Sequence, residues 1–319
     1  MASRRAPWNP EPKLVDPLIA LLCLFELLLV TLSAIKHPLP AQGQAGTLQP
    51  MLSQLSHDAQ MIRNAAILLM LLGGFTVGIL FLADRHLPRP EPPRWAMSGR
   101  AAALVLLGWH AASQVIGTLT LLALRGLPQG RLLSLPLGYG LSAALGVWML
   151  MRAEGLGWQE LRARAAPGKA FSQAAWGPAL LALGFLLAFL ATLAFSRLLR
   201  GAPRPQVELM ELLRSVRGFI PTSLLLLTVA GVAPFFEELL FRGFLLPWMR
   251  ERWGWGRALA ASSLAFGLFH LQPTLIPALS ALGLGFGLGV WRTGSVRGSM
   301  VAHALWNGGI FLMVRLAAG

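Results

Sequence analysis

Charged residues are scarce in this sequence. Only 13% of its 319 residues are charged, whereas 55% are hydrophobic, and the mean hydropathy is +0.61. Soluble globular proteins carry about 25% charged residues, so water cannot be the main solvent of this chain. The short stretches of alternating polar and apolar residues that are typical of a membrane barrel are also missing. The composition therefore predicts an all-α, polytopic transmembrane helical bundle.

Acidic residues and cysteine are in short supply too. The chain has 13 Asp and Glu against 27 Lys and Arg, a net charge of +14, and Cys23 is its only cysteine. An excess of basic residues can indicate nucleic-acid binding, but here they lie mainly between apolar stretches rather than on one continuous face. Membrane topology explains that distribution, because basic residues gather at the cytoplasmic ends of spans. We therefore expect the lipid bilayer, and no nucleic acid, as a partner, and neither an internal disulfide nor a cysteine-based metal site.

Several apolar stretches approach or exceed the roughly 20 residues that cross a bilayer. We expect about eight or nine spans, at residues 16–35, 64–83, 101–124, 132–151, 174–199, 219–249, 257–271, 274–291 and 299–317. The sixth stretch is too long for one simple crossing, so we expect it to be tilted or broken. Basic residues around the first four spans predict a cytoplasmic N-terminus. We expect the protein to be integral to a bacterial inner (plasma) membrane.

The first polar cluster inside an apolar stretch is in the segment VAPFFEELLFRGFLL, which contains Glu237, Glu238 and Arg242. Charged side chains within a membrane are costly and usually mark function. On a helix, Glu238 and Arg242 are four residues apart with the acid first, which favours an ion pair on one face. Glu237 projects about 100° away from Glu238 and has no partner in its own segment, so it is the candidate general base.

Two later segments supply polar groups at helical spacing. The segment FGLFH places Phe266 and His270 one turn apart on one face, and HALWN does the same for His303 and Asn307. Interhelical hydrogen bonding alone could explain each pair. A cavity shared by all three segments would satisfy every polar group at once, and this interpretation predicts a functional site.

These groups suit the hydrolysis of an amide bond. Glu237 and His270 can hold and deprotonate a water molecule, while His303 and Asn307 can donate hydrogen bonds to the oxyanion of a tetrahedral intermediate. A metal site is the alternative, because Glu237, His270 and His303 match the three protein ligands of a catalytic zinc ion. No H-E-x-x-H helix occurs in the sequence. We therefore favour a metal-independent reaction without a cofactor, and zinc stays the alternative.

Other polar and glycine residues have structural interpretations. His110 and Gln114 lie within an apolar stretch, where we expect them to pair between helices. The glycines of ALGLGFGLGVWRTG, at 281–294, resemble a nucleotide-binding pattern only superficially, because no strand precedes them. Close helix packing is the expected role of these glycines.

Three motifs, EELLFR at 237–242, FGLFH at 266–270 and HALWN at 303–307, closely resemble those of the CPBP family. This family, also called the Abi family, includes CAAX prenyl endopeptidases and bacteriocin-processing enzymes. The resemblance extends over 154–319, with EGLGWQELRARA at 154–165 similar to the connector before the core, and residues 1–153 are N-terminal helices of unassigned role. It implies that Glu237 is the catalytic glutamate, His270 its water-binding partner, and His303 with Asn307 the oxyanion pair, supported by Glu238 and Arg242.

The resemblance implies an intramembrane endopeptidase that cleaves a membrane-associated peptide or protein, either prenylated or a precursor. A glutamate-dependent mechanism is favoured over that of a metalloprotease. The main alternative is a non-catalytic membrane scaffold or regulator of the same family, in which the polar cluster serves packing. A small-solute transporter is a weaker alternative, because its inverted repeats are missing from the sequence.

Overall fold

The structure is a computed structural model that describes residues 18–22, 24, 57–83, 94–127, 129–199 and 207–316. All regular elements within these ranges are helical. In chain order they are α3 (His57–Ala83), α4 (Gly99–Leu124), α5 (Gly130–Glu154), α6 (Trp158–Ala165), α7 (Ala170–Ala174), α8 (Gly177–Leu199), α9 (Val207–Ser215), α10 (Phe219–Leu227), η2 (Thr228–Val232), α11 (Ala233–Glu238), η3 (Leu239–Leu245), α12 (Leu246–Phe269), α13 (Ile276–Thr293) and α14 (Arg297–Leu316).

Four helical stretches of the described chain are long and apolar enough to cross a bilayer. They are Gly99–Leu124, Gly130–Glu154, Ala170–Leu198 and Phe219–Phe269. The predicted all-α membrane bundle is therefore confirmed. The count of eight or nine spans stays a prediction, and most of the expected first span, 16–35, lies outside the described residues.

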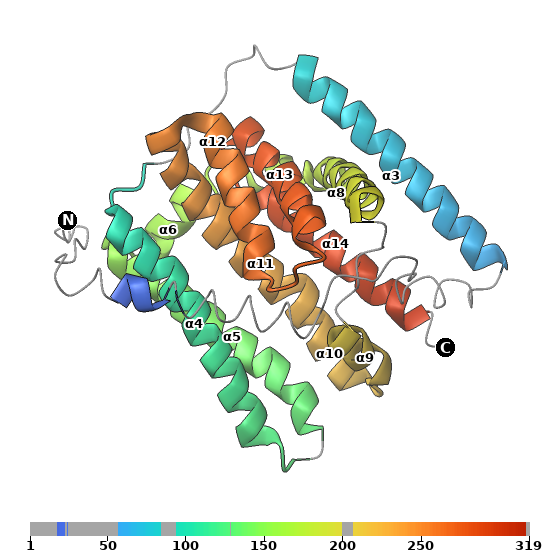
Figure 1. Cartoon of the computed structure of the whole chain (residues 1–319), viewed down its shortest axis with the longest axis horizontal. Helices are drawn as coiled ribbons and strands as arrows, with labels where there is room; N and C mark the ends of the chain where they lie inside the picture. Colours follow the sequence, from blue (N-terminus) through green and yellow to red (C-terminus); the bar gives the residue numbers. More distant parts are fainter. Residues whose placement is uncertain are drawn as a thin grey trace.

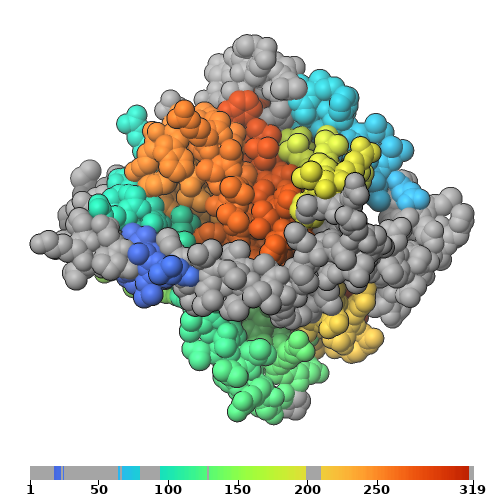
Figure 2. Space-filling model, in the orientation of Figure 1, coloured from blue at the N-terminus to red at the C-terminus, as the bar shows by residue number. Residues whose placement is uncertain are grey.

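The helices pack in two groups that meet at the long stretch 219–269. α4 lies along α5, and the pair extends from one side of the molecule (Figures 1 and 2). α8 packs against α3, α13 and α14, while α12 packs against α13. α11 contacts both α5 and α14, so it lies between the two groups. This central helix carries the first sequence motif.

Two π-helical segments, η2 and η3, flank α11. A π-helical turn holds an extra residue and widens the helix, and such turns are frequent at functional sites. A proline lies two positions after the last residue of each π segment: Pro234 follows η2, and Pro247 follows η3. Proline lacks the backbone N–H and its ring clashes with the carbonyl four residues earlier, so the regular α pattern cannot continue through it. The two prolines therefore account for the position of both π segments.

The stretch from Phe219 to Phe269 changes direction at Gly254. This glycine has φ 74° and ψ 171°, a conformation that interrupts the helix and that glycine adopts at little cost. The expected spans 219–249 and 257–271 are therefore two limbs on either side of one bend. The second limb ends with His270 as its C-cap. The next residue, Leu271, has a left-handed φ of 53°.

Glycines of α13 allow neighbouring helices to approach closely, as expected from the sequence. A Cβ atom added at Gly285 would lie 2.7 Å from Gly184 Cα, and one at Gly289 would lie 2.4 Å from a methyl group of Leu180. Both partners belong to α8. At Gly283, an added Cβ would lie 2.7 Å from a guanidinium nitrogen of Arg242. Small residues at these positions therefore set the spacing of α13 from α8 and leave room for a buried arginine.

The segment before α4 is held to the rest of the protein through its backbone. The buried carboxylate of Glu154 accepts hydrogen bonds from the backbone N–H of Ala96 and Met97 and pairs with Arg164 at 3.1 Å. The Met97 carbonyl accepts hydrogen bonds from Trp248 Nε1 at 3.1 Å and from an arginine of α12. These bonds cross residue 153, and the division of the chain at that residue stays a prediction.

Replacing Gly285 with alanine should destabilise the bundle. The new methyl group would meet the backbone of α8, which cannot move away as a side chain can, so we expect a loss of about 1–3 kcal/mol. The measurement is the thermal unfolding midpoint in detergent. Gly117→Ala is the matched control, since no atom lies within 4 Å of a Cβ added there. Equal midpoints for the two variants would contradict the proposed close packing.

Candidate active site

The second glutamate of the first motif lies at the centre of a buried network. Glu238 Oε1 accepts hydrogen bonds from Arg242 Nη1 at 3.0 Å and from His303 Nδ1 at 2.9 Å. All three side chains are at most 3% exposed. The ion pair expected from the four-residue spacing is present, and the network also joins η3 to α14. Glu238 therefore fixes the position of the imidazole ring on the last helix.

Phe266 lies beside the same groups. The Arg242 guanidinium carbon is 4.1 Å from the centre of the Phe266 ring, close enough for a cation–π interaction. The ring also contacts His270 and His303 edge-on, at centroid distances of 4.7 and 5.7 Å. Phe266 thus contacts Arg242 and both imidazoles, and it restricts the orientation of each.

Glu237 faces the two imidazoles with one oxygen. Its Oε2 atom lies 3.9 Å from His270 Nε2 and 3.8 Å from His303 Nε2. The same oxygen is buried and accepts no hydrogen bond from the described part of the protein. These separations are too long for direct hydrogen bonds, but a water molecule between the groups could bond to all three atoms. The three residues come from α11, the end of α12 and α14, so helices far apart in the chain converge here.

The hydrogen bonds of the two Nδ1 atoms determine what the Nε2 atoms can do. His270 Nδ1 donates to the Phe266 carbonyl at 2.7 Å, and His303 Nδ1 donates to Glu238. In a neutral imidazole the other nitrogen is then an acceptor. His270 Nε2 can therefore accept a proton or a hydrogen bond from water. His303 can donate through Nε2 only when its ring carries a second proton.

Tyr139 contributes a contact that the sequence analysis missed. Its phenol O–H donates a hydrogen bond to Glu237 Oε1, although the two residues are 98 positions apart. Tyr139 belongs to α5, where the chain has no recognised motif, and it is the only tyrosine in the sequence. A lone tyrosine in an apolar stretch was the available signal, because a buried phenol usually has a hydrogen-bond partner.

Asn307 lies on the same face of α14 as His303 but makes a different contact. Its side-chain amide donates a hydrogen bond to the Val229 carbonyl in η2, at 2.8 Å. An amide nitrogen has two N–H donors, so one is still free to bond elsewhere. In the structure, Asn307 therefore joins α14 to the π segment before Glu237. The oxyanion role of Asn307 stays a prediction.

Helix α4 supports the residues that precede the two candidate water-binding groups. Trp109 contacts the tilted ring of Phe236 at a centroid distance of 5.0 Å and stacks on Phe269 at 6.3 Å. His110 Nε2 lies 3.1 Å from the Phe269 carbonyl, within hydrogen-bonding distance. Gln114 contacts the same imidazole at 3.3 Å from within α4, so the expected interhelical pairing is confirmed for His110 but is not seen in this contact of Gln114. Because Phe236 precedes Glu237 and Phe269 precedes His270, α4 helps to fix the backbone on both sides of the site.

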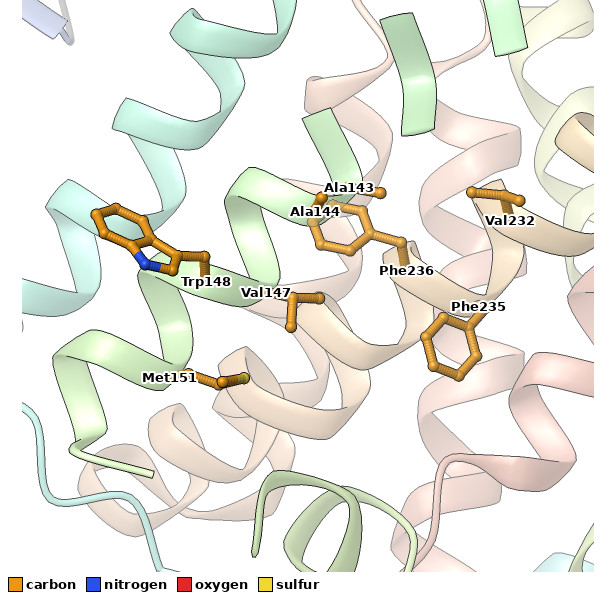
Figure 3. Close-up of a pocket in the computed structure, with 8 residues that line it drawn as sticks. All are labelled: Ala143, Ala144, Val147, Trp148, Met151, Val232, Phe235 and Phe236. Carbon is orange, nitrogen blue, oxygen red and sulfur yellow. The ribbon is translucent and has the colours of Figure 1, made fainter. Parts of the chain in front are cut away.

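An apolar cavity of about 420 Å³ lies between α5 and the η2–α11 segment (Figure 3). It is lined by Ala143, Ala144, Val147, Trp148, Met151, Val232, Phe235 and Phe236. Tyr139 lies one helical turn before Ala143, and Glu237 follows Phe236 directly. Neither Tyr139 nor Glu237 lines the cavity, but each is close in sequence to a residue that does, and the walls offer almost only carbon atoms.

The donor set suggested for zinc does not have zinc geometry in this conformation. Two ligand atoms on a tetrahedral zinc ion with bonds of about 2.0 Å lie about 3.3 Å apart. The two Nε2 atoms lie 3.8 and 3.9 Å from Glu237 Oε2. Among the residues that the structure describes, no group of three His, Cys, Asp or Glu side chains is arranged to hold a metal ion.

Comparison with known proteins gives one match, to a family model. The model of the type II CAAX prenyl endopeptidase Rce1-like family matches residues 219–309. No curated protein and no solved structure matches the chain. The matched segment contains all three motifs, from Glu237 to Asn307, whereas Tyr139 and the α4–α5 pair lie outside it. The resemblance to the CPBP proteases is thereby confirmed for the part of the chain that carries the motifs.

Proposed function

We propose that the protein is an intramembrane endopeptidase that hydrolyses a peptide bond of a membrane-associated substrate. One observation carries the proposal: Glu237 Oε2 faces the Nε2 atoms of His270 and His303 within a largely buried site. A carboxylate and two imidazoles around a common point can bind a water molecule and accept its proton. The match to a family of CAAX prenyl endopeptidases supports the same reaction.

In the proposed reaction, Glu237 Oε2 and His270 Nε2 hold the water molecule. The water oxygen attacks the carbonyl carbon of the substrate while Glu237 Oε2 takes the water proton. When the C–N bond of the tetrahedral intermediate breaks, this proton passes to the leaving amine, and the other product is a carboxylic acid. No covalent intermediate with the protein is needed, so a serine or cysteine nucleophile is not required.

His303 and Asn307 are proposed to stabilise the oxyanion. Because Nδ1 of His303 donates to Glu238, its Nε2 becomes a donor only in the doubly protonated ring. Asn307 would use the amide hydrogen that is not bonded to the Val229 carbonyl. Glu238, Arg242 and Phe266 support the site by holding these groups in place.

The apolar cavity favours a lipid-modified substrate. Its carbon-lined walls include Phe236, the residue before Glu237, so an isoprenoid chain bound there would bring a nearby peptide bond to the site. The family description, CAAX prenyl endopeptidase, agrees with this substrate class. The alternative substrate is a peptide precursor that carries no lipid. We propose further that the reaction needs no metal, since the candidate ligands lie too far apart for zinc.

We propose that the protein lies in a bacterial inner membrane, crosses it eight or nine times and has a cytoplasmic N-terminus. The distribution of basic residues around the first four apolar stretches supports the orientation. The competing function is that of a scaffold without catalysis, in which the buried network serves only packing. A scaffold would lose abundance, rather than turnover, when the site residues are replaced.

Glu237→Gln should abolish turnover while the protein still accumulates in the membrane. Loss of the general base should lower kcat by about 10²- to 10⁴-fold. Membrane proteomics comparing cells with wild-type protein and cells with the variant should reveal accumulated precursors. Glu211→Gln, which changes an exposed glutamate of α9, is the matched control. Full turnover by Glu237→Gln would remove the proposed mechanism, and equal loss of protein and activity would favour the scaffold.

Chelation should leave the activity intact. A purified preparation shown by elemental analysis to be free of metal should cleave a farnesylated CAAX peptide at the rate of the untreated enzyme. Cleavage that is lost on chelation and restored by zinc would replace the proposed mechanism with that of a metalloprotease.

Filling the apolar cavity should weaken binding of lipid-modified substrates alone. Ala144 lines the cavity and is exposed on α5, so Ala144→Phe can occupy the space without disturbing the buried core. Excluding two methylene groups of the substrate costs about 1.6 kcal/mol, which corresponds to a KM increase of about tenfold. KM is compared for peptides with and without a farnesyl group. An equal KM increase for both peptides would contradict an isoprenoid site.

A further inference from the structure

The hydrogen bond from Tyr139 to Glu237 gives the two oxygens of the carboxylate different surroundings. The phenol O–H bonds to Oε1, whereas Oε2 faces the two imidazoles. The phenol O–H is the donor of this hydrogen bond, and the carboxylate oxygen is its acceptor. The proposed reaction uses Oε2 alone, and the tyrosine bonds to the oxygen that the reaction does not use.

A carboxylate without such a bond is free to turn. The last torsion of a glutamate side chain is broad and roughly two-fold, so either oxygen can point in a given direction. Rotation would move the lone pairs of Oε2 away from the point that lies between His270 and His303. Catalysis by a positioned base requires hydrogen-bonding geometry with the proton that is removed, and small displacements are costly. A donor on Oε1 therefore orients Oε2 for the reaction.

The position of Tyr139 is itself fixed by close contacts of α5 on both sides. One residue before it, a Cβ atom added at Gly138 would lie 2.8 Å from Thr120 Oγ1 in α4. Two turns after it, a Cβ atom added at Gly146 would lie 2.3 Å from the ring of Phe236 in α11. α5 is thus packed between α4 and the helix that carries Glu237. The phenol approaches the carboxylate from a rigid support.

We propose that Tyr139 is a positioning residue that orients the Glu237 carboxylate for proton abstraction. The inference rests on the proposed function, and it assigns part of the site to α5, outside the segment matched by the family model. The helices before residue 154 then have a role in the reaction in addition to anchoring the protein.

Tyr139→Phe tests the inference, because it removes only the hydroxyl group. With a farnesylated CAAX peptide as the probe, we expect kcat to fall by about 10- to 100-fold with KM unchanged. Ser142→Ala is the matched control: it removes a hydroxyl from the same helix, and that hydroxyl bonds only to the Gly138 carbonyl of its own helix. The control should keep the wild-type kcat. Thermal unfolding of both variants shows whether a change in kcat merely follows stability.

A second measurement needs no activity. Since the chain contains one tyrosine, growth with 3-fluorotyrosine labels position 139 alone. The single ¹⁹F resonance of the full-length protein should shift when Glu237→Ala is introduced, and it should not shift with Glu211→Ala. An unmoved resonance in Glu237→Ala would overturn the inference, even if Tyr139→Phe fails to accumulate in the membrane.

The outcomes separate this inference from the proposed function. If Glu237→Gln is inactive but Tyr139→Phe keeps the wild-type kcat, only the role of Tyr139 is wrong. If Glu237→Gln is active, the proposed function itself is wrong, whatever Tyr139→Phe does. A lowered kcat in Tyr139→Phe at unchanged KM and unfolding midpoint, together with the ¹⁹F shift, supports both.

Discussion

The Glu238 carboxylate is fully buried, and its negative charge must be compensated within the protein. Arg242 supplies the charge and His303 a second hydrogen bond, both at the same oxygen. Removing one partner of a buried pair typically costs about 3–5 kcal/mol, because the other charge is left uncompensated. The network therefore does more than stabilise one helix. It determines the position of α14 relative to α11 and directs His303 Nε2 toward Glu237.

The helix that carries both glutamates is irregular on either side of them. Pro234 and Pro247 follow the π segments η2 and η3, and the Val229 carbonyl of η2 accepts a hydrogen bond from Asn307. A wider turn changes the direction in which the following side chains project, and it exposes carbonyl groups that a regular helix would use internally. In a membrane such carbonyls need partners, and an asparagine on a neighbouring helix provides one. The irregular backbone and the polar side chains thus depend on each other.

Local spacing predicted the contacts that lie within one helix. The ion pair of Glu238 and Arg242, and the shared face of His303 and Asn307, follow from the helical period. The convergence of the three motifs was inferred from the cost of polar groups in lipid, and the structure brings Glu237, His270 and His303 together.

Contacts between distant helices could not be predicted in the same way. No periodicity connects Tyr139 to Glu237, because their encounter depends on how closely α5 approaches α11. The π segments were also missed. The sequence indicated a tilted or broken helix over 219–249. It did not predict the widened π segment before Pro247 or the position of the bend at Gly254.

The hydrogen bonds that hold the segment before α4 bear on how the protein is inserted into the membrane. Ala96 and Met97 bond to Glu154, which is 58 and 57 residues further along the chain, whereas the partners of the Met97 carbonyl in α12 lie 151 and 155 residues further along and leave the ribosome later. His303 follows later still. A nascent chain therefore inserts its early helices before Glu237, His270 and His303 can come together. The order of translation alone therefore keeps the candidate site incomplete until α14 has been synthesised.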